Sequence, residues 1–302
     1  MELQDLRLVI KVADTGGLSA AAKLLGLSRS AASQRLAALE LELGTTLFQR
    51  TTRAIILTAD GQQLLERARR LVADADELAS SFAGARNLKG RVRADVPTAF
   101  ARNLVLPRLH ELLALHPHLA IELSTSDRRV DLRREGLDCV LRMGGLGDPS
   151  LTAMKLGLLP MVTCVSPAYI QRHGLPRTPG DLAGHLVVHY AQSLDEGAPS
   201  LELMVGDLVV DHPMRHLVAV NGIDAYRAAG LCGFGLIQVP RYSMVDELAS
   251  GALIEVLAEH PAPPLPVAIV HPYGRNAPRR VRVFMSWLAS LVEPHLRPGP
   301  AR

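Results

Sequence analysis

The sequence predicts an α/β protein that begins with an all-α winged helix-turn-helix, continues through a long linker helix and ends in a two-lobed α/β domain. Apolar residues recur at helical spacing over most of the first 43 residues, and a second helical repeat follows a pair of short strands. From residue 91 onward, apolar strands alternate with helical segments, which is typical of α/β domains. We therefore expect three domains, at residues 1–58, 59–87 and 88–302.

Composition narrows the class of protein. Of the 302 residues, 48% are hydrophobic, which is enough to bury more than one core. No apolar run approaches the ~20 residues that span a bilayer, and the first residues lack a basic segment followed by an apolar one. We therefore expect a cytoplasmic protein without a membrane partner. The three cysteines, Cys139, Cys164 and Cys232, are widely spaced and odd in number, which favours reduced thiols, with a redox-sensing pair as the alternative.

Three short helices are predicted within the first domain. Residues 3–13 place apolar side chains at helical spacing, and 14–17 break this helix. Ser19 can cap a second short helix that runs to Leu25. A tight turn follows, and Ser28 is the expected N-cap of a third helix over 29–43. The inner face of that helix carries Ala32, Leu36 and Leu39.

The outer face of the third helix carries short polar groups and arginines near its N-terminal end. The net charge of +3 does not by itself indicate a nucleic-acid partner, but the stretch from Lys23 to Arg35 holds three cations and no acid. A helix, a tight turn and a second helix that displays such groups have the geometry that enters a DNA major groove. An ordinary solvated helix face is the alternative. The predicted DNA contacts on this helix are Ser28, Arg29, Ser30, Ala31, Ser33, Gln34 and Arg35.

A β-hairpin wing is expected after Gly44 ends the third helix. Residues 47–50 and 54–57 are predicted as its two strands, around the tip 51–53. Side chains at such a tip can reach phosphates or place an arginine in a neighbouring minor groove. The predicted DNA contacts of the wing are Arg50, Thr51, Thr52 and Arg53.

These residues resemble the family of LysR-type transcriptional regulators. The phrases that match are Gly-Gly-Leu-Ser-Ala-Ala-Ala-Lys-Leu-Leu (16–25), Leu-Ser-Arg-Ser-Ala-Ala-Ser-Gln-Arg-Leu-Ala-Ala-Leu-Glu (27–40), Leu-Gly-Thr-Thr-Leu-Phe-Gln-Arg (43–50) and Leu-Thr-Ala-Asp-Gly (57–61). The resemblance implies a regulator that binds double-stranded promoter DNA, with RNA polymerase as a further partner if it activates transcription.

The resemblance also implies roles for single residues. The positions that match Arg29, Ser30, Ser33 and Gln34 face base edges or nearby phosphates in the family, and the position that matches Arg53 belongs to the wing. Gln34 is a departure, because the family often has Arg or Lys there. Its contact could favour adenine or be only structural.

A long linker helix is predicted to start at Ala59, with Thr58 as its cap. About 28 residues give a rod of roughly 40 Å. Apolar residues repeat along it with spacings of four and three, which indicates a coiled-coil seam, and a helix packed on its own domain is the alternative. The family resemblance implies a homodimer or homotetramer. The predicted dimerisation residues are Leu64, Ala68, Leu71, Ala75, Leu78 and Phe82.

The C-terminal two hundred residues are predicted to form two α/β lobes joined by two crossings. Lobe 1 is expected at about 91–160 and 266–302, with a helix over 127–135, and lobe 2 at about 161–265. This layout resembles type 2 periplasmic solute-binding proteins, and the effector domain of LysR-type regulators resembles them too. The phrases at 123–132 and 166–170 strengthen that resemblance.

An effector site is expected between the lobes, because ligands of open α/β sheets bind beyond the carboxyl ends of strands. Hydroxyl and amide groups there would suit an anionic or carbonyl group of a small-molecule effector, and simple helix capping is the alternative. No other cofactor is predicted. The predicted effector-binding residues are Thr98, Phe100, Ser124, Thr125, Ser126, Arg142, Met143, Gly144, Ser166, His189, Asn221 and Pro240.

Catalytic and metal-binding residues are not predicted. The segment Gly230–Gly235 has the spacing Gly-x-x-Gly-x-Gly but lies between a helix and a strand, which favours a tight turn over a dinucleotide site. The pairs His116/His118 and His185/His189 lack a third metal ligand. Two alternatives to a regulator remain: a solute-binding protein without DNA activity, and an α/β enzyme with a helical appendage. The sequence favours a DNA-binding regulator modulated by a small molecule.

Overall fold

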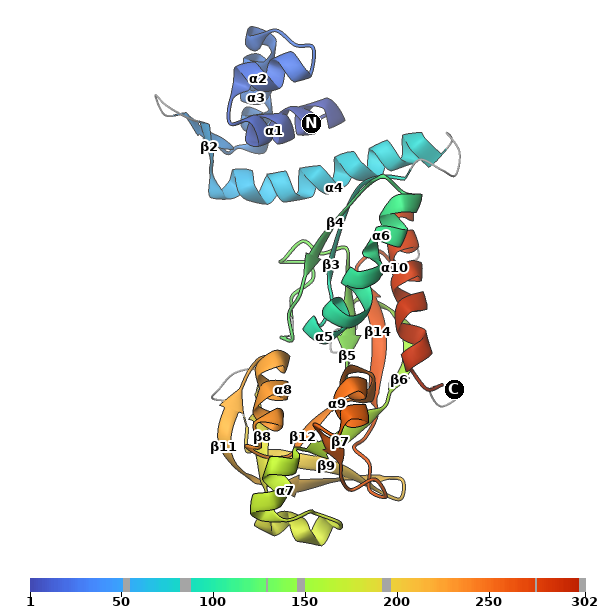
Figure 1. Ribbon diagram of the computed structural model, residues 1–302. Coiled ribbons are helices and arrows are strands. Elements are labelled where there is room, and N and C mark those ends of the chain that lie inside the picture. Colours follow the sequence, from blue (N-terminus) through green and yellow to red (C-terminus); the bar gives the residue numbers. More distant parts are fainter. Residues whose placement is uncertain are drawn as a thin grey trace. The chain divides into compact units, whose positions relative to one another are not determined.

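The computed structural model describes residues 1–50, 55–81, 88–128, 130–145, 150–191, 197–274 and 276–298 (Figure 1). The chain divides into two compact units, Met1–Arg91 and Val92–Arg302. Each unit has a hydrophobic core of its own. Among the described residues, none of the helices is both long and apolar enough to cross a membrane.

The first unit opens with three helices, α1 (Leu3–Thr15), α2 (Leu18–Leu24) and α3 (Arg29–Leu43), that share one core. The prediction that Ser28 caps α3 is confirmed, because its Oγ accepts a hydrogen bond from the Ala31 N–H at 3.1 Å. The prediction that Ser19 caps α2 is wrong. The helix begins one residue earlier, at Leu18, because extended Gly17 is its N-cap residue and Ser19 already lies in the first turn.

A short hairpin and a long helix complete the first unit. Strand β1 (Phe48–Arg50) pairs antiparallel with β2 (Ile55–Leu57), and Phe48 lies opposite Leu57. Helix α4 (Ala59–Ser81) follows at once. The Thr58 hydroxyl accepts a hydrogen bond from the Gly61 N–H at 2.9 Å and so caps α4, as predicted. Leu65 and Ala68 of α4 are buried in the core that α1, α2 and α3 form.

Gly61 allows α4 to start directly against the strand that leads into the wing. A Cβ atom at this position would lie only 2.1 Å from the Leu47 carbonyl oxygen, which belongs to the backbone. No side chain fits there unless the backbone moves. The junction between wing and linker helix therefore depends on glycine.

Lobe 1 of the second unit is a five-stranded sheet of order β4-β3-β5-β14-β6. Strands β3 and β5 are parallel, whereas β14 runs antiparallel to both β5 and β6. In Figure 1, helices α6 and α10 lie side by side, and their apolar faces join the sheet in one core. The strands are β3 (Lys89–Asp95), β4 (His118–Ser124), β5 (Cys139–Met143), β6 (Thr152–Leu159) and β14 (Leu265–His271); the helices are α5 (Thr98–Phe100), a π-helical turn (Ala101–Val105), α6 (Leu106–Leu115), α10 (Arg279–Val292) and the 3₁₀ turn Glu293–His295.

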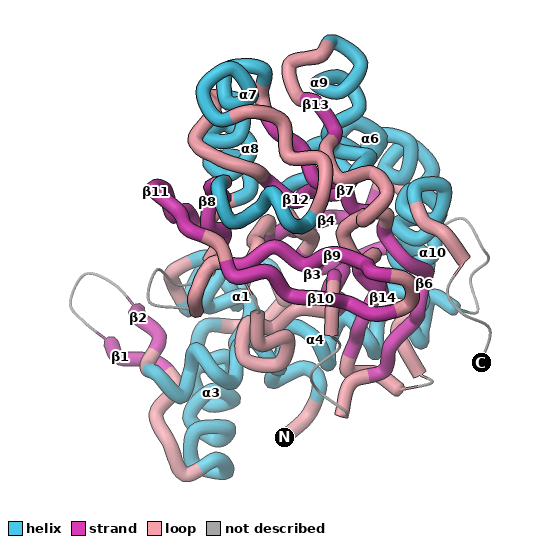
Figure 2. The backbone as a smooth tube through the Cα atoms, turned by 90° about the horizontal axis from the view of Figure 1, so that it is seen from below, coloured by secondary structure: helices cyan, strands magenta, loops and turns pink. Residues whose placement is uncertain are grey.

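Lobe 2 lies between the two crossings, and three small sheets form it: β12-β7-β13, β11-β8 and β10-β9. A bridge between Val187 and Leu236 links β8 to β12. Figure 2 shows β9 and β10 side by side; only residues 209–211 of this hairpin were predicted as strand. The elements are β7 (Met161–Val165), α7 (Pro167–His173), the 3₁₀ turn Pro179–Gly184, β8 (Leu186–Tyr190), β9 (Ser200–Val205), β10 (Leu208–Pro213), β11 (Arg215–Val220), α8 (Ile223–Leu231), β12 (Ile237–Pro240), the 3₁₀ turn Arg241–Met244, α9 (Val245–Ser250) and β13 (Ile254–Glu255).

The helix predicted over 127–135 is wrong. The described residues of this segment form bends and turns instead of a helix. The Asp131 carboxylate accepts hydrogen bonds from the backbone N–H groups of Arg133 and Arg134, both at 3.1 Å. An aspartate that bonds to the backbone two and three residues ahead stabilises a local turn, which here replaces the helical ladder.

We predict that Gly61→Ala destabilises the first unit, because the added Cβ collides with the Leu47 backbone. Overpacking of this kind costs about 1–3 kcal/mol. Thermal unfolding should therefore show a clearly lower Tm than wild type. Gly17→Ala is the matched control, since a Cβ there meets nothing within 4 Å. Equal Tm values for the two variants would contradict the steric argument.

Candidate functional site

The N-terminal end of α3 forms an exposed polar surface. The side chains of Arg29, Ser30 and Gln34 are exposed, and those of Ala31 and Ser33 are half-buried. The opposite face of α3 is fixed in the core by its apolar residues, so these groups stay turned to solvent. The structure thus brings together five of the residues predicted to contact DNA.

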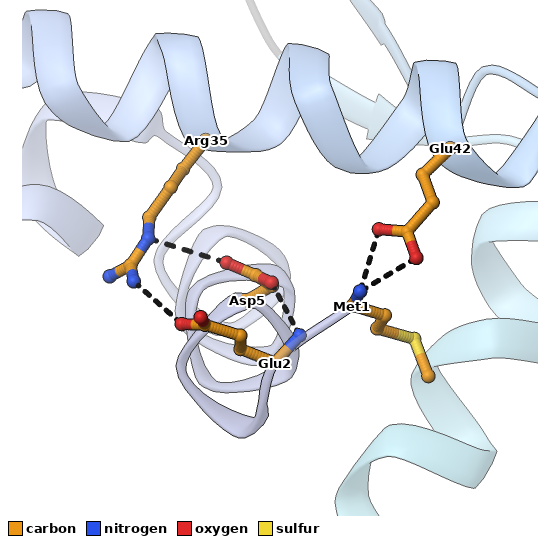
Figure 3. A network of polar contacts seen from close by, with 5 residues as sticks. All are labelled: Met1, Glu2, Asp5, Arg35 and Glu42. Carbon is orange, nitrogen blue, oxygen red and sulfur yellow. Dashed lines mark hydrogen bonds and ion pairs between the residues drawn. The ribbon is translucent and has the colours of Figure 1, made fainter.

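The Arg35 guanidinium forms two ion pairs within the first unit (Figure 3). Nη2 lies 3.2 Å from Glu2 Oε2, and Nε lies 3.3 Å from Asp5 Oδ1. Both carboxylates belong to the start of α1. In the same figure the N-terminal ammonium of Met1 binds Glu42 at the far end of α3. Surface pairs of this kind are worth about 0–1 kcal/mol each, and here they join α3 to the start of α1, while the DNA contact of Arg35 stays a prediction.

The predicted contacts of the wing stay predictions. Arg50 ends β1, but its side chain, together with Thr51, Thr52 and Arg53, lies outside the described residues. The base of the hairpin is bound to α3, because the Glu40 carboxylate accepts hydrogen bonds from the Leu47 and Phe48 N–H groups at 2.7 and 3.2 Å.

The predicted dimerisation seam of α4 divides into two parts. Leu64 packs against the core of the first unit and Ala68 is fully buried in it, so the alternative of a helix packed on its own domain describes these two positions correctly. Leu71 is 51% exposed and Ala75 is half-buried. The side chain of Leu78, and Phe82 as a whole, lie outside the described residues.

A cavity of about 290 Å³ lies between the two lobes of the second unit. This volume is at the small end of ligand pockets, which occupy ~300–1,000 Å³. Both lobes contribute walls, as the resemblance to solute-binding proteins implied. Of the predicted effector residues, Ser126, Arg142, Met143, Gly144 and Pro240 line it.

Several lining residues were missed. Asp95 is the last residue of β3 and Tyr190 the last of β8, and neither was among the predicted effector residues. Tyr226 lies in α8 and Gln238 in β12, and both reach the cavity. The rule that ligands bind at the carboxyl ends of strands therefore finds the correct edge of the sheet. It must include the last residue of each strand as well as the residues that follow it.

Other predicted residues lie elsewhere. Phe100 is fully buried in the core of lobe 1. Ser166 caps α7 by accepting a hydrogen bond from the Tyr169 N–H at 3.3 Å, so the capping alternative is right there. The His189 ring centroid lies 5.2 Å from that of His216. These positions do not line the cavity.

The remaining predicted residues act indirectly or face solvent. Thr98 contributes its backbone N–H to a hydrogen bond with Asp127 at 3.1 Å. Ser124 hydrogen-bonds to the Asp95 carboxylate. Thr125 and Asn221 are exposed, and neither lines the cavity.

Asp127 connects the two lobes at the cavity wall. Its Oδ1 accepts the hydrogen bond from Thr98 in lobe 1, and its Oδ2 accepts one from the Ile223 N–H in lobe 2 at 3.2 Å. Ile223 begins α8, and the amide groups at a helix start carry partial positive charge. One carboxylate thus satisfies donors from both lobes, and the Arg102–Asp224 ion pair is a second link at the same turn of α8.

Asp95 is the most buried charged group of the cavity wall. Its residue is only 2% exposed, and burial raises the pKa of its carboxyl above the ordinary value. Hydrogen bonds from Ser124 and Ser126 oppose this rise, the latter at 3.1 Å between Ser126 Oγ and Asp95 Oδ2. Desolvation is the larger effect, because hydroxyl donors replace only part of the lost hydration.

Two of the three cysteines lie in the protein interior and the third lies at the surface. Cys139 and Cys164 are free and buried, and desolvation raises the pKa of each thiol, to about 12 for Cys164. Cys232 is free and exposed. The described part of the chain contains no cluster of three or more potential metal ligands. The segment Gly230–Gly235 runs from the last turn of α8 into the predicted turn before β12, where a Cβ on Gly235 would lie 2.6 Å from the Val187 backbone.

The two units match two known protein families. Residues 3–62 match the bacterial regulatory helix-turn-helix proteins of the lysR family, and residues 85–292 match the LysR substrate binding domain. The chain belongs to the LysR family of transcriptional regulators. This LysR-type regulator therefore has a helix-turn-helix domain that binds DNA and a second domain for an effector, which confirms the predicted family, fold class and function.

Relatives and solved structures agree over nearly the whole length. The regulator is 39% identical over 296 residues to the HTH-type transcriptional regulator YhjC of Escherichia coli (strain K12), covering 98% of this chain and 99% of that one. An HTH-type transcriptional repressor of Pseudomonas aeruginosa (strain UCBPP-PA14) is 31% identical, with 96% and 92% covered. CrgA of Neisseria meningitidis, a LysR-type transcriptional regulator, superposes with a TM-score of 0.59 at 25% identity, over 96% of this chain and 98% of that one.

We predict that Asp127→Ala loosens the lobes of the regulator, because the Thr98 and Ile223 N–H groups lose their shared acceptor. A charge-assisted hydrogen bond contributes roughly 1.5–3 kcal/mol, so the Tm of the second unit should fall by several degrees. Calorimetry of the full chain measures this. Asp207→Ala, in the exposed β9–β10 turn, is the control and should leave the Tm unchanged. An unchanged Tm for Asp127→Ala would contradict the bridge.

We also predict that Asp95→Asn stabilises the regulator increasingly as the pH rises. The pKa of Asp95 is higher in the folded state than in the unfolded chain. Its contribution to stability is therefore present at low pH and is lost as the pH rises through the folded-state pKa. Asparagine carries no charge at any pH. The Tm difference between variant and wild type should become more positive from about pH 4 to about pH 7.5, and a difference independent of pH would refute the assignment.

Proposed function

We propose that this LysR-type regulator reads a promoter site through α3 and the wing, and that a small molecule in the cavity between the lobes sets its output. The observation that carries the proposal is the cavity itself. Both lobes line it, and a carboxylate that binds both lobes stands in its wall. A molecule that enters this space changes the contacts that hold the lobes together. No constellation of reacting groups is needed for this role, so we propose a regulator and not an enzyme.

Base recognition is proposed for the exposed start of α3. The Gln34 amide can bond the N6 and N7 atoms of adenine, and Arg29 can reach guanine or a phosphate. Ser30 and Ser33 have the short hydroxyl groups that suit contacts to phosphate oxygens. The predicted residues of the wing would add contacts outside the major groove.

We further propose a homodimer or homotetramer that acts on promoter DNA in the cytoplasm, with RNA polymerase as a partner if the output is activation. The exposed Leu71, one turn beyond the buried part of α4, supports self-association through the C-terminal half of this helix. Two heads on one assembly match two half-sites on successive turns of the duplex.

The effector is proposed to act by changing the angle between the lobes. The Asp127 bridge and the Arg102–Asp224 ion pair both join lobe 1 to the first turn of α8. A ligand that separates or tightens these contacts moves lobe 2 as a body about the two crossings. Effector binding and DNA binding are then linked through the positions of the lobes in the assembly.

We predict that the purified regulator protects a stretch of several helical turns in the promoter region beside its own gene. Arg29→Ala should weaken this protection about tenfold or more, since a specific arginine contact is worth roughly 1–3 kcal/mol. Footprinting over a protein titration measures the change. Arg215→Ala removes the same charge from an exposed position in lobe 2 and should bind as wild type does. Absence of protection at low salt would contradict the proposal, and equal weakening by both variants would contradict the role of α3.

A further inference from the structure

The cavity between the lobes contains a buried carboxylate without a counter-ion. Asp95 accepts hydrogen bonds from Ser124 and Ser126, but no cationic side chain of the described residues forms an ion pair with it. Arg142 attracts it only from a distance, as the weakest influence on its carboxyl group. A carboxylate that is removed from water and not paired is unfavourable for the fold. Such a group in a ligand cavity indicates that the ligand supplies what is missing.

The charged groups of the cavity wall are two carboxylates and two guanidinium groups, with the Glu135 carboxylate close by. Asp127 also lines the wall, and Glu135 adds a third carboxylate nearby. Arg128 and Arg142 are the guanidinium groups of the wall. Arg128 is paired with Glu135 at 3.0 Å, and Arg142 donates to the Val130 carbonyl oxygen. Because Arg128 is already paired with Glu135, the two wall carboxylates, Asp95 and Asp127, are left with a single guanidinium group, that of Arg142.

The rest of the wall suits a small apolar body. The rings of Tyr190 and Tyr226 line the cavity with their centroids 5.2 Å apart. Aromatic faces attract cations, and the phenol of each tyrosine stays neutral because burial raises its pKa. Met143, Met161 and Leu265 add apolar surface. A volume of about 290 Å³ admits only a compact molecule.

We propose that the effector is a compact organic amine, whose ammonium group binds the Asp95 carboxylate and whose apolar body lies against Tyr190 and Tyr226. This assignment rests on the proposed function, in which the cavity is the effector site. An ammonium group compensates the negative charge that the chain leaves unpaired. A carboxylate ligand, as the sequence suggested, would meet both Asp95 and Asp127 at short range and be repelled.

The pH dependence of binding follows from the same pair of charges. Alkyl ammonium groups have pKa values of about 10 and stay charged in the range where Asp95 titrates. The ammonium group binds the ionised carboxylate, so the affinity should rise with pH through the pKa of Asp95 and then level off. The other charged groups around Asp95 are Asp127, Arg128 and Arg142 in the cavity wall and the nearby Glu135.

Titration calorimetry on the full-length protein tests the proposal with probes of matched shape and opposite charge. The probes are benzylamine and cyclohexylamine, each compared with benzoate and cyclohexanecarboxylate. We expect at least one amine to bind ten times or more tightly than its carboxylate counterpart. Asp95→Asn, which keeps the shape of the side chain, should weaken amine binding at least tenfold. Asp207→Asn, outside the cavity, should bind as wild type does.

Tighter binding of the carboxylates, failure of both amines to bind, or equal amine affinity in Asp95→Asn would each overturn the proposal. The footprinting assay separates this result from the function itself. Wild-type protein that protects the promoter site but binds neither amine removes the effector class and leaves the regulator intact. Loss of promoter protection in the wild-type protein refutes the proposed function instead.

Discussion

The two lobes of the second unit are joined at the cavity wall by the Asp127 carboxylate, which binds backbone donors from both. The chain crosses between the lobes twice, and these two crossings alone would not fix the angle between the lobes. Asp127 fixes that angle at the cavity wall, because it accepts from Thr98 at the start of α5 and from Ile223 at the start of α8. Both donors are end groups of helices and have no partner within their own helix. Their shared acceptor satisfies two backbone groups and closes the cleft in one interaction.

Asp95 lines the same cavity wall, but its hydrogen-bond donors and its burial differ from those of Asp127. Asp127 receives two amide N–H groups, whereas Asp95 receives two serine hydroxyls and is almost completely removed from water. The first carboxylate is satisfied by the fold, and the second is not. Chains do not retain an uncompensated buried charge for stability, since a neutral residue of the same shape would serve the fold better. The contrast separates a carboxylate that holds the lobes from one that awaits a ligand.

The sequence predicted much of the fold because local signals agreed with tertiary packing. Ser28 has the residue type and the spacing of an N-cap, and α3 has an apolar face that leaves no other register. The prediction failed where a side chain competed with the helix, as Asp131 does in the turns that replace the helix expected over 127–135. The seam of α4 was ambiguous for a different reason. A heptad pattern states which face is apolar, and it does not state whether another chain or the same chain covers it.

For the cavity, the sequence could locate the correct sheet edge but not the decisive groups. Ser126 follows the end of β4, Arg142 and Pro240 lie within the last two residues of β5 and β12, and that rule found all three. Asp95 is the last residue of its strand, and an aspartate after alternating apolar residues gives no sign that its surroundings lack a cation. Tyr226 comes from a helix of the other lobe. Charge compensation is a property of three-dimensional neighbours, so only the folded chain shows which carboxylate is left unpaired.

The first unit makes the linker helix part of the DNA-reading head. Leu65 and Ala68 of α4 lie in the same core as the inner face of α3, and Arg69 pairs with Asp14 at the end of α1. Because Gly61 has no side chain, the start of α4 packs directly against the Leu47 backbone. Close packing of this kind does not bend gradually, so a rotation of α4 carries α3 with it as a rigid body. A change in the position of α4 therefore also moves the exposed polar surface of α3.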